Sequence, residues 1–116
     1  MKDINGKIQY KDKEYRLVFN LNVMESIQDE YGSLDAWGKL TDGTVNGEPN
    51  AKAVIYGFRE MLNEGIDIDN DENGTDIQPL SLKQVGRIIT EVGLKEATNV
   101  LNKTVIESTQ SAEKNA

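Results

Sequence analysis

The sequence predicts an α+β fold that is mainly helical, with one N-terminal β-hairpin followed by about five mostly amphipathic helices. In the first twenty residues apolar side chains alternate with polar ones, which is the period of a half-buried strand. From residue 22 onward the apolar side chains recur every three or four residues, which is the period of a helix packed on one face. A chain of 116 residues makes one domain. We place this domain at residues 1–108, and we expect the polar residues 109–116 to form a flexible tail.

The hairpin is predicted from two short alternating segments on either side of a polar turn. Residues 11–14 connect the two strands, with Asp12 as the best turn former. A lone hairpin is marginally stable in water, so its apolar face must pack on a helical layer or on another chain. The alternating apolar side chains are Ile8, Tyr10, Tyr15, Leu17 and Phe19.

Two helices are expected next, separated by Gly32. Asn22, with Glu25 three residues later, resembles a capping box, so we expect the first of these helices to begin at Asn22 and to stop at Gly32. Ser33 is expected to cap a short second helix, and residues 41–50 have the composition of a loop. The apolar faces consist of Val23, Met24, Ile27 and Tyr31 in the first helix and of Leu34, Trp37 and Leu40 in the second.

The third helix is predicted to begin near Glu48 or Asn50 and to end at Gly65. Tyr56 lies on the side opposite its apolar stripe. The acidic residues 65–79 have no helical stripe, and we expect them to form an exposed, mobile loop, of which residues 66–78 are dispensable for folding. The stripe of the third helix consists of Ala51, Val54, Ile55, Phe58, Met61 and Leu62.

The last two helices are predicted on either side of Gly93. Ser81 and Gln84 form a capping box at the start of the fourth helix. Ile106 falls outside the apolar stripe of the fifth. The two stripes consist of Leu82, Val85, Ile88, Ile89 and Val92, and of Leu94, Ala97, Leu101 and Val105.

The composition excludes several classes of protein. The chain contains no cysteine and no histidine, which removes disulfides, thiolate chemistry, the usual general base and the commonest metal ligand. We therefore expect a protein that is not an enzyme and needs no cofactor. A net charge of −7 disfavours nucleic acid as a partner. The longest apolar run, 53–56, is too short to span a membrane, and no signal peptide follows Lys2, so we expect a cytoplasmic protein.

The negative charge is concentrated in one segment that resembles part of a metal site. Residues 60–82 contain seven acidic and no basic side chains, which equals the whole net charge of −7. Within them Asp69, Asp71 and Asn73, followed by glycine, match the opening of a calcium-binding loop. The twelfth position of such a loop is a bidentate Glu, but here it is Leu80. We expect a solvated acidic segment in which these three residues are at most weak ligands and no ion binds tightly.

Two side chains are candidates for binding a partner. Tyr56 and Ile106 both lie off the apolar stripes of their helices. Single exposed apolar residues are common on monomeric proteins, so an ordinary surface position is the simpler interpretation. The alternative is that neither is needed for the core and that at least one of them belongs to a partner-binding surface.

Three segments of the chain resemble a known family. LVFNLNVMESIQDEYGS (17–33), EPNAKAVIYGFREMLNEGIDI (48–68) and PLSLKQVGRIITEVGL (79–94) resemble small proteins of prophages of Gram-positive bacteria. The resemblance extends over residues 7–108 and is one of pattern; the hairpin turn departs from the Asn-Gly-Lys of that family. This family is similar to phage tail assembly chaperones.

The resemblance implies a non-enzymatic role in building phage tails. A tail assembly chaperone binds the tape measure protein, brings tail tube subunits to it, and acts in the cytoplasm of the bacterial host. Self-association is compatible with this role, and the chain would correspond to the short form of a pair related by a frameshift. The main alternative is a structural virion component of the tail tube or head-tail connector. A further alternative is a small regulatory binder, such as a DNA mimic.

Overall fold

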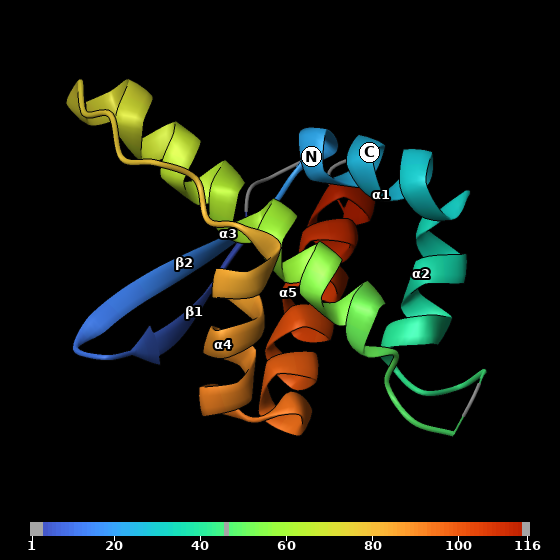
Figure 1. Ribbon diagram of the computed structural model, residues 1–116. Coiled ribbons are helices and arrows are strands. Elements are labelled where there is room, and N and C mark those ends of the chain that lie inside the picture. The colour runs from blue at the N-terminus through green and yellow to red at the C-terminus, as the bar shows by residue number, and fades with distance from the viewer. Residues whose placement is uncertain (1–3, 46, 115–116) are drawn as a thin grey trace.

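The structure is a computed structural model that describes residues 4–45 and 47–114, with the side chains of residues 6–45 and 47–109. A two-stranded antiparallel sheet precedes five helices in the described part of the chain, which confirms the predicted α+β fold (Figure 1). The elements are β1 (Ile4–Tyr10), β2 (Lys13–Phe19), α1 (Leu21–Tyr31), α2 (Leu34–Thr41), α3 (Ala51–Asn73), α4 (Leu82–Val92) and α5 (Leu94–Lys114). No helix in these residues is long and apolar enough to cross a membrane.

The hairpin closes through a two-residue turn. Ile8 pairs with Tyr15 and Tyr10 with Lys13, so only Lys11 and Asp12 lie between the strands. Both have positive φ angles, 47° and 61°, as a type I′ turn requires at its two central positions. β1 contacts α4 and α5, and β2 contacts α3 and α5. The hairpin therefore packs on a helical layer, as its apolar alternation predicts.

Helix α1 begins at Leu21, one residue earlier than predicted, and its capping residue is not the predicted one. Its N-cap is Asn20, whose side-chain oxygen accepts a hydrogen bond from the backbone N–H of Val23 at 3.3 Å. Asn22 lies inside the first turn, so the predicted capping box with Glu25 is wrong. The backbone of Asn20 is extended, because it follows directly on β2, and an extended residue is what an N-cap needs. Ser33 caps α2 as predicted, accepting from the N–H of Ala36 at 3.0 Å.

The predicted end of the third helix at Gly65 is wrong. Helix α3 begins after Asn50, one of the two predicted starts, and continues to Asn73, where Gly74 closes it in a left-handed conformation with φ 64°. Gly65 is buried inside this helix against β2, and a Cβ atom there would lie 2.8 Å from the carbonyl oxygen of Arg16. This glycine allows helix and strand to approach closely. The Arg16 guanidinium also bonds to Asp69 at 2.7 Å, which ties the next turn of α3 to β2.

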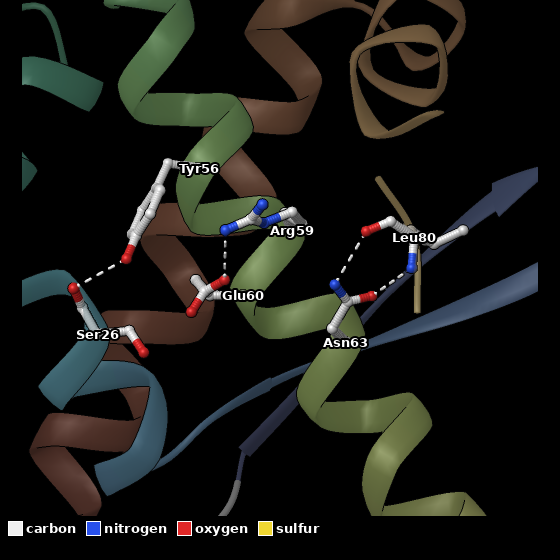
Figure 2. A network of polar contacts seen from close by, with 6 residues as sticks. All are labelled: Ser26, Tyr56, Arg59, Glu60, Asn63 and Leu80. Atoms are coloured by element: carbon white, nitrogen blue, oxygen red, sulfur yellow. Dashed lines mark hydrogen bonds and ion pairs between the residues drawn. The ribbon is translucent and has the colours of Figure 1, made fainter. Parts of the chain in front are cut away.

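The chain returns from α3 to α4 along α3 itself. The side-chain amide of Asn63 donates to the carbonyl of Leu80 at 3.0 Å and accepts from its N–H at 2.8 Å (Figure 2). Asn70 makes the same pair of bonds with Ile77, both at 3.0 Å. The predicted loop over residues 65–79 is therefore helical as far as Asn73, and the exposed remainder is held by two asparagine side chains.

Helix α5 is longer than the sequence predicts. The capping box of Ser81 and Gln84 is present at the start of α4, but α5 continues through Lys114 and includes six residues of the predicted tail. Residues 115–116 lie outside the described part of the chain. Threonine hydroxyls donate to carbonyls four residues earlier in α5, including Thr109 to Val105 at 3.1 Å, so these hydroxyls find their partners within the helix.

One core joins the hairpin to all five helices. Trp37 is buried, and its indole N–H donates to the carbonyl of Ala53 at 2.9 Å. The largest fully buried side chains are Trp37, Phe19, Phe58, Leu17, Ile27, Met61, Leu62 and Leu101. Leu82 and Leu94, placed in stripes by their spacing, are 47% and 39% exposed because they are the first residues of their helices.

Candidate partner-binding groove

An open apolar groove runs between α3 and α4 and reaches the C-terminal end of α1. Its volume is about 670 Å³. Four of its residues on α3 are spaced i, i+3, i+4 and i+7 and therefore share one face of that helix. We call it the α3–α4 groove; it is lined by Glu30 of α1, Lys52, Ile55, Tyr56 and Arg59 of α3, and Leu82, Lys83 and Gly86 of α4.

The floor of the α3–α4 groove is apolar and is left open by a glycine. Ile55 and Tyr56 are half-buried, and Leu82 is largely exposed. A Cβ atom on Gly86 would lie 3.8 Å from Cδ1 of Ile55, which is an ordinary van der Waals contact. Helix packing therefore does not require a glycine at position 86. Its missing side chain leaves space beside Ile55 that an apolar group of a ligand can fill.

Tyr56 forms one wall of the groove and also joins α3 to α1. Its hydroxyl donates to the carbonyl of Ser26 at 3.0 Å (Figure 2). Its ring meets that of Tyr31 edge-on, with centroids 5.5 Å apart. The Arg59 guanidinium lies 5.7 Å from the centroid of the Tyr56 ring. The expectation that Tyr56 lies apart from the core is wrong, because the ring packs against it. Because α3 contacts α1 as well as β2, α4 and α5, it also buries part of the face next to its main stripe.

Burial is the main influence on the tyrosine hydroxyls of this wall. It raises the pKa of Tyr56 above the usual value, and the carboxylates of Glu60 and Glu30 raise it further. The pKa of Tyr31 is raised by burial and by Glu30. Both hydroxyls therefore keep their protons at neutral pH, and Tyr56 can act as the donor to Ser26.

Positive side chains border the apolar floor. Lys52 and Lys83 are exposed, and neither takes part in an ion pair among the described side chains. The Arg59 guanidinium is paired with Glu60 at 3.2 Å (Figure 2). Glu30 is the one acidic residue of the lining. The groove thus combines an apolar floor with positively charged side chains at its border.

The other predicted partner-binding residue lies elsewhere. Ile106 is on α5 with 52% of its surface exposed, and it is not part of the α3–α4 groove. The structure therefore does not bring Tyr56 and Ile106 to one surface.

The three candidate metal ligands do not form a calcium loop. Asp69, Asp71 and Asn73 all lie in the last turns of α3, where successive odd positions point to different sides of the helix. Asp69 is already paired with Arg16. Among the side chains of residues 6–45 and 47–109, no three acidic groups lie close enough together to hold a metal ion.

Sequence reasoning missed most of the groove. It singled out Tyr56 but assigned Ile55 and Leu82 to buried stripes and gave no role to the three basic residues. The signal was present in Lys52, Ile55, Tyr56 and Arg59, a second helical face with apolar residues between two cations. Comparison of the chain with protein-family models, with curated proteins and with solved structures gives no match.

Proposed function

We propose that the protein is a non-enzymatic phage tail assembly chaperone that binds the tape measure protein in the α3–α4 groove. The observation that carries this proposal is the groove itself, in which half-buried Ile55 and Tyr56 and the exposed Leu82 together form an uncovered apolar floor. Two of the three segments that resemble the prophage family, 48–68 and 79–94, contain every lining residue except Glu30.

The groove is suited to a helical ligand. All of its lining residues belong to helices, so it offers side-chain packing and no strand edge for main-chain pairing. An amphipathic helix can place its apolar face in such a groove with anchors at helical spacing. A tape measure protein is long and helical, and covering its apolar stripes one segment at a time would keep it from aggregating. The net charge of −7 favours the solubility of such a complex.

Tail tube subunits are the second proposed partner. The outer edge of β1 pairs with no other strand among the described residues, so its backbone groups could accept an added strand from a tube subunit or from another copy of the chain. Delivery of tube subunits to the tape measure protein would then use a surface separate from the α3–α4 groove.

Co-expression with the tape measure protein of the same prophage tests the proposal. Leu82→Ser removes an exposed apolar side chain from the groove and should weaken co-purification about ten-fold or more, as the loss of an apolar anchor does. Because Leu82 is 47% exposed, stability should stay within about half a kcal/mol. Val45→Ser is the matched control, since Val45 is 58% exposed and lies outside the groove.

Two results would contradict the proposal. If the Leu82 variant binds the tape measure protein as before and Ile106→Ser weakens that binding, the partner surface lies on α5. Finding the protein in purified mature virions would favour the alternative, a structural component of the tail tube or head-tail connector, because an assembly chaperone leaves before the particle is complete.

A further inference from the structure

The cations of the α3–α4 groove are placed on both of its sides. Lys52 and Arg59 are seven residues apart on α3, about 10 Å along the helix axis, and Lys83 faces them from α4. A ligand that covers Ile55 and Tyr56 would therefore have positive charge on either side of its apolar stripe. Lys52 and Lys83 also stand in the first turns of their helices, where the helix dipole adds to the positive potential.

The groove differs in sign from the rest of the molecule. The lining carries three basic residues and one acidic residue, whereas the whole chain has 13 basic and 20 acidic residues. Of the three basic residues that line the groove, only Arg59 has a carboxylate partner among the described side chains, and that partner is Glu60. A ligand without negative charge that covered Lys52 and Lys83 would remove their two ammonium groups from water. Because no carboxylate would compensate for the lost hydration, such binding is unfavourable.

We propose that the α3–α4 groove selects an amphipathic helix whose apolar stripe is flanked by acidic side chains. This inference rests on the proposed function of the groove and specifies the chemistry of its partner. The apolar stripe of the ligand fills the space over Ile55 and beside Gly86. Its carboxylates pair with the ammonium groups of Lys52 and Lys83, which sets the orientation of the helix and excludes helices with basic flanks.

Two synthetic helical peptides test the selection directly. They have the same length and the same leucine stripe, and differ only in carrying glutamate or lysine on the flanks of that stripe. Binding to the full-length protein is measured by fluorescence anisotropy at low and at high NaCl. We expect the glutamate peptide to bind about ten-fold or more tightly than the lysine peptide, and this preference to shrink as salt screens the charges.

Charge reversal on the protein provides the matched variants. Lys83→Glu should weaken binding of the glutamate peptide, and the double change Lys52→Glu with Lys83→Glu should reverse the preference between the peptides. Lys95→Glu is the control, because Lys95 is also exposed and is also the second residue of its helix, yet it lies outside the groove. All three positions accept an acidic side chain in the first turn, so the variants should fold, as circular dichroism can verify.

Each result decides the question. Equal affinity for the two peptides, no binding of either, or an equal loss in the Lys95 variant would overturn the inference. If the charge variants instead abolish self-association while neither peptide binds, the occupant of the groove is a second copy of the chain. If tape measure binding depends on Leu82 but is unaffected by both lysine reversals, the proposed function stands and the selection for acidic flanks is wrong.

Discussion

Two glycines inside helices of this protein occupy opposite environments, one closely packed and one open. Gly65 is buried at the contact of α3 with β2, and a side chain there would meet the Arg16 carbonyl oxygen. Gly86 lies in the α3–α4 groove, where a Cβ atom would find ordinary contact distance to Ile55. The same residue type thus serves close packing at one position and open space for a ligand at the other.

Alanine at these two positions should change stability in opposite directions. Gly86→Ala should raise the free energy of unfolding by about 0.5 to 1 kcal/mol, because alanine is the better helix former and meets no obstacle. Gly65→Ala should lower it by about 1 to 3 kcal/mol, because the backbone of β2 must move away. Urea denaturation of both variants measures the two effects. A loss of stability on Gly86→Ala would show that α4 packs closer to α3 than the structure indicates.

At the scale of elements, the position of residues 74–81 between α3 and α4, which we call the return segment, depends on a geometric match. Asn63 and Asn70 are seven residues apart, which is about 10 Å along a helix. Their partners Leu80 and Ile77 are three residues apart, which is also about 10 Å in extended chain. Each asparagine amide can therefore pair with both the N–H and the C=O of one residue of the segment, as the four bonds show.

Removing these amides should release the segment as a unit. Asn63→Ala loses two hydrogen bonds and should lower the free energy of unfolding by about 1 to 3 kcal/mol. Asn70→Ala should lower the free energy of unfolding by less, since the hydrogen bonds of Asn70 are exposed. In the double variant the loss should be smaller than the sum of the two single losses, because releasing either end of the return segment already loosens the other end. Hydrogen exchange of the Leu80 amide should accelerate in the Asn63 variant. Asn99→Ala, at an exposed position on α5, is the control. If the two losses of stability add fully in the double variant, Asn63 and Asn70 hold the return segment independently.

The sequence predicts the elements of this fold better than it predicts their ends. Period-2 and helical patterns identify the hairpin and all five helices of the described chain, and Ser33, Asn50 and Ser81 are recognisable caps. The local pattern wrongly predicts a helix end at Gly65. A glycine is needed there because the helix contacts Arg16 of β2, 49 residues away in the sequence, and no local pattern contains that contact. The sequence does not show the last turns of α3, because their partners, Arg16 on β2 and residues 75–77 beyond the helix end, lie outside the helical pattern itself.

The candidate groove was predictable only in part. Tyr56 stood out because it lies off the main stripe, but the floor also requires Leu82, which comes from another helix. Local spacing cannot show which faces of α3 and α4 remain uncovered once the helices have packed. Burial of Tyr56 against the core likewise depends on α1, whose Tyr31 and Ser26 meet it from 25 and 30 residues away.

At the scale of the whole molecule, charge is separated between two regions of α3. The face that lines the groove carries Lys52 and Arg59, whereas the helix from residue 60 onward and the return segment carry the seven acidic residues of 60–82. Several of these acids lie near the C-terminal end of α3, where the helix dipole disfavours negative charge. In the described structure only Glu60 and Asp69 of this group are in ion pairs. Repulsion within this region should therefore oppose folding at low ionic strength.

Salt should consequently stabilise the fold while it weakens binding of an acidic helix. Raising NaCl from about 20 to 300 mM shortens the screening length several-fold and should raise the melting temperature by about 2 to 5 °C. Asp71→Asn removes one exposed acid from the last turn of α3, so it should raise stability at low salt and reduce the dependence on salt. Asp29→Asn, an exposed acid on α1 outside the 60–82 segment, is the control and should leave the salt dependence nearly unchanged. Scanning calorimetry at several NaCl concentrations measures the melting temperatures of the unmodified protein and of the two variants. A melting temperature that falls with salt would mean that attraction between the acidic segment and the basic groove or hairpin outweighs repulsion within the segment.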